Sequence, residues 1–215
     1  MTSLIFCFIY LFIHFMAWLF CGKCTSNARL DDKVAVITGC NTGIGKITAM
    51  EFCKRGARVI MACRNLEKAK LPRRTFDSKT ADVKNAGEIV VKELNLASLK
   101  SIRQCAEDIL ASEEYIHLLV NNAGVMMCPR ELTEDGHELQ FGTNHLGHFS
   151  ITMLLLPRII KSAPARIVNL SSLAHTWGKL YFLITLFLWK KEKTKLKSQL
   201  IRLTRVSGPL VTLPF

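Results

Sequence analysis

Short apolar runs alternate with amphipathic stretches along most of this chain. Runs rich in Val, Ile and Leu predict buried strands, and stretches in which apolar residues recur every three or four positions predict helices. The predicted strands are Val34–Ile37, Arg58–Cys63, Glu88–Leu94, His117–Val120 and Arg166–Leu170. The predicted helices are Gly45–Arg55, the stretch from Ser98 as N-cap to Leu110, and Asn144–Ile160. This alternation predicts an α/β fold of the Rossmann-like, doubly wound kind, built on a parallel sheet.

For two of these helices, the sequence also predicts which side chains are buried. In the first helix, Ile47, Met50 and Phe52 are expected to face the sheet. Gly56 follows this helix and is expected to end it as a C′ residue. The last helix has apolar residues on most of its sides, which predicts burial all round.

An apolar stretch precedes the first predicted strand. Leu4–Phe20 is almost wholly apolar, and its length is at the low end of the roughly 17–25 residues that a membrane-spanning helix needs. We therefore expect residues 1–22 to form an N-terminal transmembrane helix, with a buried core helix as the alternative. The first basic residues after it, Lys23 and Arg29, predict by the positive-inside tendency that the rest of the chain faces the cytoplasm.

The composition argues against several classes of function. The formal net charge is +12, but the chain has no basic stripe interleaved with aromatic residues, so we expect no nucleic-acid partner. The 8 cysteines are scattered and do not resemble a disulfide framework. Cys21 and Cys24 form a lone C-x-x-C without a second pair, so we expect no metal site. An oligomer is compatible with the sequence, although no pattern indicates one.

A glycine-rich turn directly follows the first predicted strand and carries most of the candidate chemistry. Its spacing, GxxxGxG, differs from GxGxxG and from the phosphate loop GxxxxGK[ST], which argues against a kinase or GTPase. A turn between a strand and a helix N-terminus can hold a phosphate group, and an ordinary strand-to-helix turn is the alternative. The predicted cofactor-binding residues of this turn are Thr38, Gly39, Asn41, Thr42, Gly43, Ile44 and Gly45.

The end of the second predicted strand indicates which dinucleotide is bound. An NAD-binding unit carries Asp or Glu there for the ribose hydroxyl groups, whereas this strand ends in Cys63 and Arg64. An arginine without a carboxylate favours a 2′-phosphate, and hence NADP over NAD. The alternative is that Arg64 only solvates the end of a strand. Asn122 and Ser172 also follow strands, so both are expected at this same edge of the sheet.

Several motifs in the expected order resemble the short-chain dehydrogenase/reductase family. They are Thr38-Gly39-x-x-x-Gly43-Ile44-Gly45, Asn121-Asn122-Ala123-Gly124, Asn144 within Asn-His-Leu-Gly-His-Phe, and Val168-Asn169-Leu170-Ser171-Ser172. Further details, such as Ala62-Cys63-Arg64, resemble its membrane-anchored retinol dehydrogenase branch. The resemblance covers about residues 30–179. It implies an NADP-binding Rossmann domain that moves a hydride to or from retinoids or similar lipophilic substrates, and an endoplasmic reticulum membrane as the location.

The resemblance also assigns roles to residues of the expected site. It implies that Ser172 is the catalytic serine, which donates to the substrate oxygen, and that Asn144 holds a proton-relay water through the main chain of its helix. It places Asn122, Ala123 and Gly124 on the ribose side of the cofactor. Asn95 and Leu96 stand where relatives have Asp-Leu beside the adenine, and we expect the amide to weaken that contact.

The chain departs from the family pattern after Lys179. The family's acid/base group is the tyrosine of Tyr-x-x-x-Lys, and none of the three tyrosines here is followed by lysine at that spacing. Residues 180–215 read as a divergent tail, apolar at first and then basic. We therefore expect a chain that ends early, with a sheet that is incomplete on its C-terminal side and exposes an edge.

Two other functions compete with the oxidoreductase. One is a non-catalytic, membrane-associated nucleotide-binding or interaction protein, with the basic tail against anionic lipid. The other is a methyltransferase on the same nucleotide fold, which is supported only by the glycine turn and leaves Asn122-Ala123-Gly124 and Ser171-Ser172 without a role.

Overall fold

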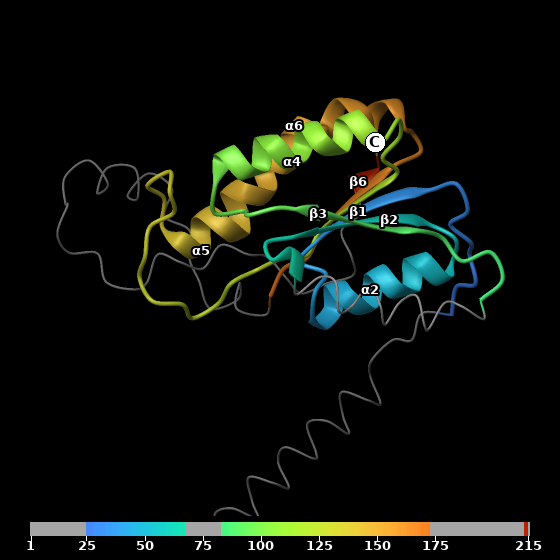
Figure 1. Cartoon of the computed structure of the whole chain (residues 1–215), viewed down its shortest axis with the longest axis horizontal. Helices are drawn as coiled ribbons and strands as arrows, with labels where there is room; N and C mark the ends of the chain where they lie inside the picture. The colour runs from blue at the N-terminus through green and yellow to red at the C-terminus, as the bar shows by residue number, and fades with distance from the viewer. Residues whose placement is uncertain (1–24, 68–82, 173–212, 215) are drawn as a thin grey trace, which may run out of the picture.

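The computed structural model describes residues 25–67, 83–172 and 213–214 of the chain (Figure 1). Its strands form one sheet in the order β3-β2-β1-β4-β5-β6. They are β1 (Val34–Thr38), β2 (Arg58–Cys63), β3 (Ile89–Glu93), β4 (Leu118–Asn121), β5 (Arg166–Asn169) and β6 (Leu213–Pro214). The first five strands pair in parallel. The chain adds β2 and β3 on one side of β1, then crosses to the other side and adds β4 and β5. This order confirms the predicted Rossmann-like sheet.

Helices cover both faces of the sheet. One face carries α2 (Gly43–Lys54), and the other carries α4 (Leu99–Ser112) and α6 (Gly147–Lys161), which lie side by side (Figure 1). A short helix α5 (Leu139–Phe141) and a π-helical turn η1 (Gly142–Leu146) lead directly into α6. Ser98 caps α4 by accepting the N–H of Ser101 with its hydroxyl oxygen, as predicted.

Two apolar clusters fill the space between these layers. The larger lies between the sheet and the α4–α6 layer, and the smaller lies between the sheet and α2. In β1, Val36 belongs to the first cluster and Ile37 to the second, because successive side chains of a strand point to opposite faces. Both side chains are fully buried, which explains why the central strand is a continuous apolar run.

The structure differs from the prediction that the fifth strand, β5, is an exposed edge. Leu213–Pro214 pairs with β5 in the antiparallel sense, with Ile167 opposite Leu213 and Arg166 opposite Pro214. The unpaired main-chain groups of an edge strand accept such a partner readily. The first five strands form the parallel sheet that was predicted, and β6, which was not predicted, makes the described sheet mixed.

The first helix buries a different face from the one predicted. Its buried residues are Gly45, Ala49 and Cys53, which recur every four positions, and Ile47 is 62% exposed. Met50 and Phe52 are partly buried against the cluster below the sheet. Small side chains form the contact face because α2 lies close to the turn and sheet. The predicted burial of Ile47 was wrong, whereas Gly56 ends the helix at φ +96° as expected.

The last helix is buried on one face only. His148, Ile151, Leu155 and Ile159 face the core, whereas four large apolar side chains are exposed. These are Phe149, Met153, Leu154 and Ile160. Burial on all sides was therefore a wrong prediction, since this layer has the sheet on one side only.

Two predicted segments lie outside the described residues. They are the membrane anchor, residues 1–22, and nearly all of the divergent tail, residues 180–215. Within the ranges that the structure describes, no helix combines the length and the apolar character needed to cross a membrane.

Candidate functional site

The glycine turn joins β1 to α2 at the carboxyl edge of the sheet. Thr38 is the last residue of β1 and is fully buried, and α2 begins at Gly43. Thr42 is the N-cap residue, its side chain makes no capping hydrogen bond, and the first turn of α2 has no acidic residue. Ile44 is 68% exposed beside it. The N-terminus of α2 thus offers main-chain N–H groups and the positive end of a helix dipole to an anion.

Two glycines of this turn allow very close contacts between chain segments. A Cβ atom on Gly45 would lie 2.4 Å from Nδ2 of Asn122 and 2.5 Å from the carbonyl oxygen of Gly39. A Cβ atom on Gly39, whose φ is +68°, would lie 2.8 Å from Cα of Ala123. By contrast, no atom of the described residues lies within 4 Å of the corresponding position on Gly43. The turn therefore packs against the segment after β4 and stays open at Gly43.

Hydrogen bonds fasten this turn to the segment that follows β4. The hydroxyl oxygen of Thr38 accepts the N–H groups of Asn122, at 2.9 Å, and Ala123, at 3.0 Å. The side-chain amide of Asn122 donates to the carbonyl oxygens of Thr38, at 2.9 Å, and Gly39, at 3.1 Å. Asn122 is therefore tied to the turn through both its main chain and its side chain.

Asn144 lies in the π-helical turn and holds the next part of the same loop. Its side-chain oxygen accepts the N–H of Val125, and its side-chain amide donates to the carbonyl of Val125, both at 2.8 Å. A Cβ atom on Gly124 would lie 3.6 Å from the Asn144 side-chain oxygen. In the π-helical turn, the N–H of Gly147 bonds the carbonyl of Gly142, five residues back. Such turns often occur at functional sites.

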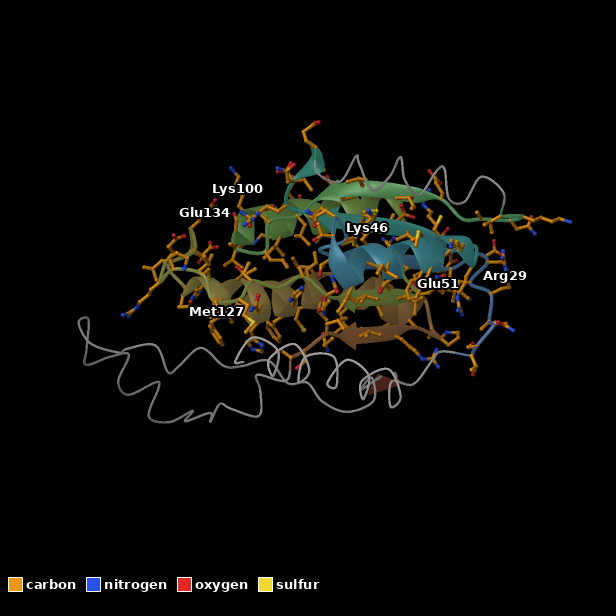
Figure 2. All side chains as sticks on the ribbon, turned by 90° about the horizontal axis from the view of Figure 1, so that it is seen from below. Arg29, Lys46, Glu51, Lys100, Met127 and Glu134 are labelled. Carbon is orange, nitrogen blue, oxygen red and sulfur yellow. The ribbon has the colours of Figure 1, made fainter. Side chains whose placement is uncertain are left out.

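The loop after Val125 extends outward from this edge. Met127 is 86% exposed and adopts a positive φ of 54°, which is rare for a long side chain. Its N–H donates to the side-chain oxygen of Gln140 at 3.2 Å. Figure 2 shows Met127 at one end of the molecule and Arg29, which precedes β1, at the other. The candidate site therefore lies at the end of the molecule that carries Met127.

Arg64 follows β2 at this edge and is exposed, as the sequence predicted. The preceding residue, Cys63, is buried below the glycine turn. A hydrogen bond with the Cys40 thiol lowers the pKa of the Cys63 thiol, and the N–H groups of Cys40 and Asn41 act in the same direction, while burial opposes them.

Asn95 and Leu96 follow β3 and have structural contacts of their own. The side-chain oxygen of Asn95 accepts the N–H of Ala97 at 3.1 Å, and its own N–H donates to the hydroxyl of Ser101 at 2.9 Å. Leu96 is buried in the larger apolar cluster. Its carbonyl oxygen lies 2.5 Å from where a Cβ atom on Gly147 would be, so α6 approaches this segment closely.

Ser171 and Ser172 continue from β5 beside the end of β4. Asn121 and Asn169 are opposite each other in the two strands, and the N–H of Leu170 donates to the carbonyl of Asn121. Both serines are half-buried, and the hydroxyl of Ser171 is among the buried side-chain atoms of the described part that have no hydrogen-bond partner. Ser172 therefore lies at the predicted edge, one residue beyond an unsatisfied hydroxyl.

The structure thus brings together the ends of β1, β4 and the π-helical turn by direct hydrogen bonds. Arg64, Asn95 and Ser172 lie beyond the ends of β2, β3 and β5, at the same edge of the sheet. Sequence reasoning missed His148, which contacts both Thr38 and Asn144. A signal was present, since His148 is a polar residue on the apolar face of a helix, four positions after Asn144.

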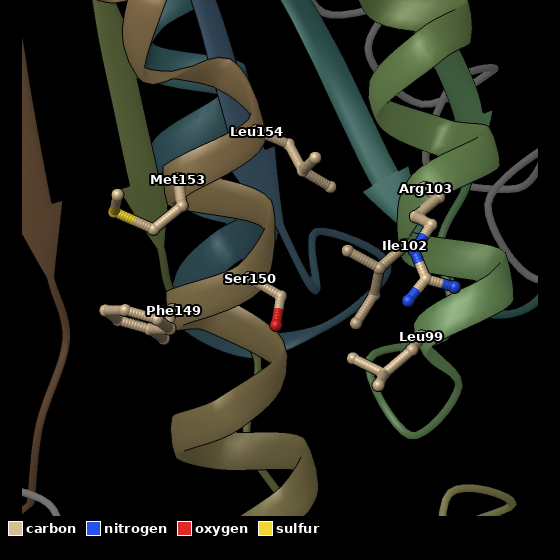
Figure 3. A pocket seen from close by; sticks show the side chains of 7 residues that line it. All are labelled: Leu99, Ile102, Arg103, Phe149, Ser150, Met153 and Leu154. Atoms are coloured by element: carbon tan, nitrogen blue, oxygen red, sulfur yellow. The ribbon is translucent and has the colours of Figure 1, made fainter.

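A separate hollow of about 300 Å³ opens between α4 and α6 (Figure 3). It is lined by Leu99, Ile102, Arg103, Phe149, Ser150, Met153 and Leu154. None of these residues was predicted for the site. In the ranges that the structure describes, no three His, Cys, Asp or Glu side chains gather as potential metal ligands.

A phosphate-binding turn at the switch point of a doubly wound sheet defines a class of nucleotide-binding α/β proteins. Comparison with known proteins narrows this class. The family model described as short chain dehydrogenase matches residues 33–181. The chain therefore belongs to the short-chain dehydrogenase family, and within this family it is similar to retinol dehydrogenases, as the following relatives show.

Mouse retinol dehydrogenase 11 is 53% identical over 161 residues, which is 75% of this chain and 50% of that protein. Human retinol dehydrogenase 13 is 49% identical over 161 residues, or 75% of this chain and 47% of that protein. This chain thus spans about half the length of these curated relatives. The predicted resemblance is confirmed at the level of family and branch.

Solved structures agree on the fold. An uncharacterized protein from Mycobacterium paratuberculosis is 38% identical, with a TM-score of 0.62 over 78% of this chain and 56% of that chain. A metagenomic short-chain oxidoreductase, solved in complex with NADP, is 28% identical, with a TM-score of 0.59 over 68% of this chain and 65% of that chain. Both matches support the Rossmann-like fold described above.

Proposed function

We propose that this chain binds NADP(H) at the glycine turn and acts as an oxidoreductase on retinoids or similar lipophilic alcohols and carbonyl compounds. The proposal rests on one observation. The hydroxyl of Thr38 accepts hydrogen bonds from Asn122 and Ala123 and so holds the glycine turn against them, at the open N-terminus of α2. Main-chain N–H groups after Gly43 would hold the pyrophosphate. The names of the retinol dehydrogenase relatives suggest the substrate class.

The residues at this edge fit the cofactor. The absence of a Cβ atom at Gly43 leaves room above the helix N-terminus, since no described residue lies within 4 Å of where that atom would be. Arg64 is an exposed cation at the end of β2 and would pair with a 2′-phosphate. Asn122, Ala123 and Gly124 would line the ribose side, and Asn95 with Leu96 would lie near the adenine. The NADP bound to the metagenomic relative supports the choice of nucleotide.

For the reaction, this chain would supply binding, orientation and hydrogen bonds. When bound, the nicotinamide accepts or donates a hydride. The hydroxyl of Ser172 would donate to the substrate oxygen and stabilise the charge that develops there. The main-chain carbonyl of Asn144, in the π-helical turn, would orient a water molecule for proton transfer.

A binding experiment tests the nucleotide and its phosphate. Arg64→Asp should weaken NADPH binding by at least about 10-fold relative to NADH, because a charge-assisted contact is replaced by repulsion. Dissociation constants are measured by titrating the quenching of protein fluorescence with each nucleotide. Arg166→Asp is the matched control, since Arg166 is an exposed arginine at the start of β5, the opposite edge of the sheet. No affinity of the wild-type chain for NADPH would overturn the proposal.

A second function is favoured by one specific observation. The chain has no Tyr-x-x-x-Lys, and loss of a general acid/base typically lowers a rate by about 10²–10⁴. The second candidate is therefore a non-catalytic, nucleotide-binding protein at a membrane. Oxidation of NADPH in the presence of all-trans-retinal separates the two: robust turnover supports the enzyme, and binding without turnover supports the second candidate.

We also propose that residues 1–22 anchor the chain in a membrane, the endoplasmic reticulum by analogy with the branch, with the nucleotide domain in the cytoplasm. The support is the apolar run Leu4–Phe20 and the basic residues after it. Extraction of cell membranes with alkaline carbonate tests this, because an integral protein stays in the pellet. Release into the supernatant would contradict the anchor.

A further inference from the structure

His148 lies on the buried face of α6, where its neighbours along the helix face are Ile151 and Leu155. Its side chain makes two hydrogen bonds that connect distant parts of the chain. Nε2 lies 2.9 Å from the hydroxyl oxygen of Thr38, 110 residues away, and Nδ1 lies 2.9 Å from the main-chain carbonyl oxygen of Asn144. A buried polar side chain with both nitrogen atoms paired is expected to have one defined protonation state.

The partners of the ring determine where its proton lies. A hydroxyl group has one donor and two acceptor positions. The Thr38 oxygen already accepts the N–H groups of Asn122 and Ala123, so its own hydrogen is directed to Nε2, which must carry a lone pair. The Asn144 carbonyl can only accept, so Nδ1 must carry the hydrogen. Both arguments give the same neutral tautomer, with the proton on Nδ1.

The surroundings of the ring favour the neutral form. Burial lowers the pKa of His148, and the nearby His145 acts in the same direction, while the hydrogen bond to the Asn144 carbonyl opposes them. A charged ring would place a third donor against the Thr38 oxygen, which has no remaining lone pair. The geometry of the hydrogen bonds and the effect of burial therefore agree.

We propose that His148 is a positioning residue of the nucleotide site: its neutral ring joins Thr38, which holds the segment Asn122–Ala123, to the carbonyl of Asn144 in the π-helical turn. This inference rests on the function proposed above and names a residue that acts through others. By accepting the Thr38 hydrogen, His148 fixes both lone pairs of that oxygen towards Asn122 and Ala123. By donating to Asn144, it holds a main-chain carbonyl of the π-helical turn.

The first test reads the protonation state directly and needs no nucleotide. Long-range ¹H–¹⁵N NMR spectra of the ¹⁵N-labelled chain at neutral pH distinguish the two neutral tautomers and the charged ring. We expect the His148 signals to report a protonated Nδ1 and an unprotonated Nε2, and Thr38→Val to change this pattern. A proton on Nε2, or a charged ring, would overturn the proposed link.

The second test separates the effects of the two hydrogen bonds that the ring makes. Asparagine places its amide near the position of Nδ1, and glutamine places its own near the position of Nε2. His148→Asn should therefore keep the bond to Asn144 and lose the bond to Thr38, weakening NADPH binding by about 3- to 10-fold, the usual range for one lost hydrogen bond. His148→Gln, which can still accept from Thr38, should restore affinity to within about 3-fold of the wild type.

A double-mutant cycle shows whether His148 acts through Thr38. In the Thr38→Val background, His148→Asn should have no further effect on NADPH affinity, whereas Thr38→Ser keeps the hydroxyl and should preserve the full effect. His145 is exposed on the same turn of helix, so His145→Asn is the matched control for folding and binding. Effects of Thr38→Val and His148→Asn that simply multiply would overturn the proposal.

Failure of this inference can be told apart from failure of the proposed function. A wild-type chain without NADPH affinity removes the nucleotide site and, with it, the role assigned to His148. Normal NADPH affinity together with independent effects of the two substitutions removes only that role. If the variants fail to fold, the NMR spectrum of the wild-type chain still decides the tautomer on which the link depends.

Discussion

Small substitutions at Thr38 and Gly45 should have the largest effect on the candidate site. The Thr38 hydroxyl contacts three groups from the segment after β4 and from α6, and Gly45 lies against the Asn122 amide and the Gly39 carbonyl. In both cases the side chain, or its absence, joins segments that are more than 70 residues apart in the sequence. The site is therefore sensitive to single atoms.

Gly45→Ala should destabilise the fold by about 1–3 kcal/mol, because the added methyl group overlaps the Asn122 amide and the Gly39 carbonyl. NADPH binding should be lost, since those groups shape the turn. The free energy of unfolding in urea and a nucleotide titration measure the two effects.

The matched control for Gly45 is Gly43→Ala, two residues earlier in the turn. A Cβ atom there meets nothing within 4 Å, although φ is +57°. We expect only the conformational penalty of about 1–2 kcal/mol for a side chain in the left-handed region. Equal losses in the free energy of unfolding would contradict a steric role for Gly45.

Among the elements, α4 is joined to both β2 and α6 through one residue at its end. The carboxylate of Glu113 accepts two hydrogen bonds from Arg58, at 2.9 and 3.0 Å, and its main-chain carbonyl accepts from Arg158 of α6. The Glu113 side chain is 4% exposed, whereas that of Arg58 is 35% exposed. This contact lies at the amino edge of the sheet, away from the candidate site.

Glu113→Gln should therefore reduce stability without affecting the site. We expect a loss of about 1–3 kcal/mol, below the full effect of breaking a buried ion pair because Arg58 keeps contact with water. Glu88→Gln is the matched control, since Glu88 pairs with the same arginine but its side chain is 65% exposed. That change should cost less than about 1 kcal/mol. Equal losses in urea unfolding would show that burial of Glu113 is unimportant.

For the whole molecule, the central strand is held by a histidine at each end. The N–H of Val34, at the start of β1, donates to Nδ1 of His117 at 3.1 Å, and Thr38, at its end, donates to Nε2 of His148. Both rings accept a hydrogen bond and must therefore be neutral at the accepting nitrogen. Burial lowers the pKa of each, with Lys33 adding to the effect at His117 and His145 at His148.

This arrangement predicts acid sensitivity of the fold. Because each folded-state pKa lies below the ordinary value of 6.5, the unfolded chain binds more protons and stability falls as the pH decreases below about that value. Urea unfolding at pH 7.5, 6.5 and 5.5 measures the slope. His117→Gln and His148→Gln should each reduce it. A slope that neither substitution changes would mean that other groups control the pH dependence.

The sequence predicted much of this fold because the relevant signals are local. Val34–Ile37 is apolar on both faces, Ser98 precedes a helical pattern, and Gly56 follows one, so each can be read within a window of a few residues. The placement of Ile47 could not be read this way. Two faces of α2 carry apolar residues, and only the close approach of the helix to the sheet selects the face of Gly45, Ala49 and Cys53.

The sequence alone determined the glycine turn, the family motifs and the order of strands and helices, since these depend on neighbouring residues and on the handedness of the chain. Only the tertiary structure decided which side chains meet. The links from Thr38 to Asn122 and His148 span 84 and 110 residues, and the pairing of Leu213 with Ile167 joins two strands far apart in the chain. Contacts of that range depend on how the layers pack, which no local pattern specifies.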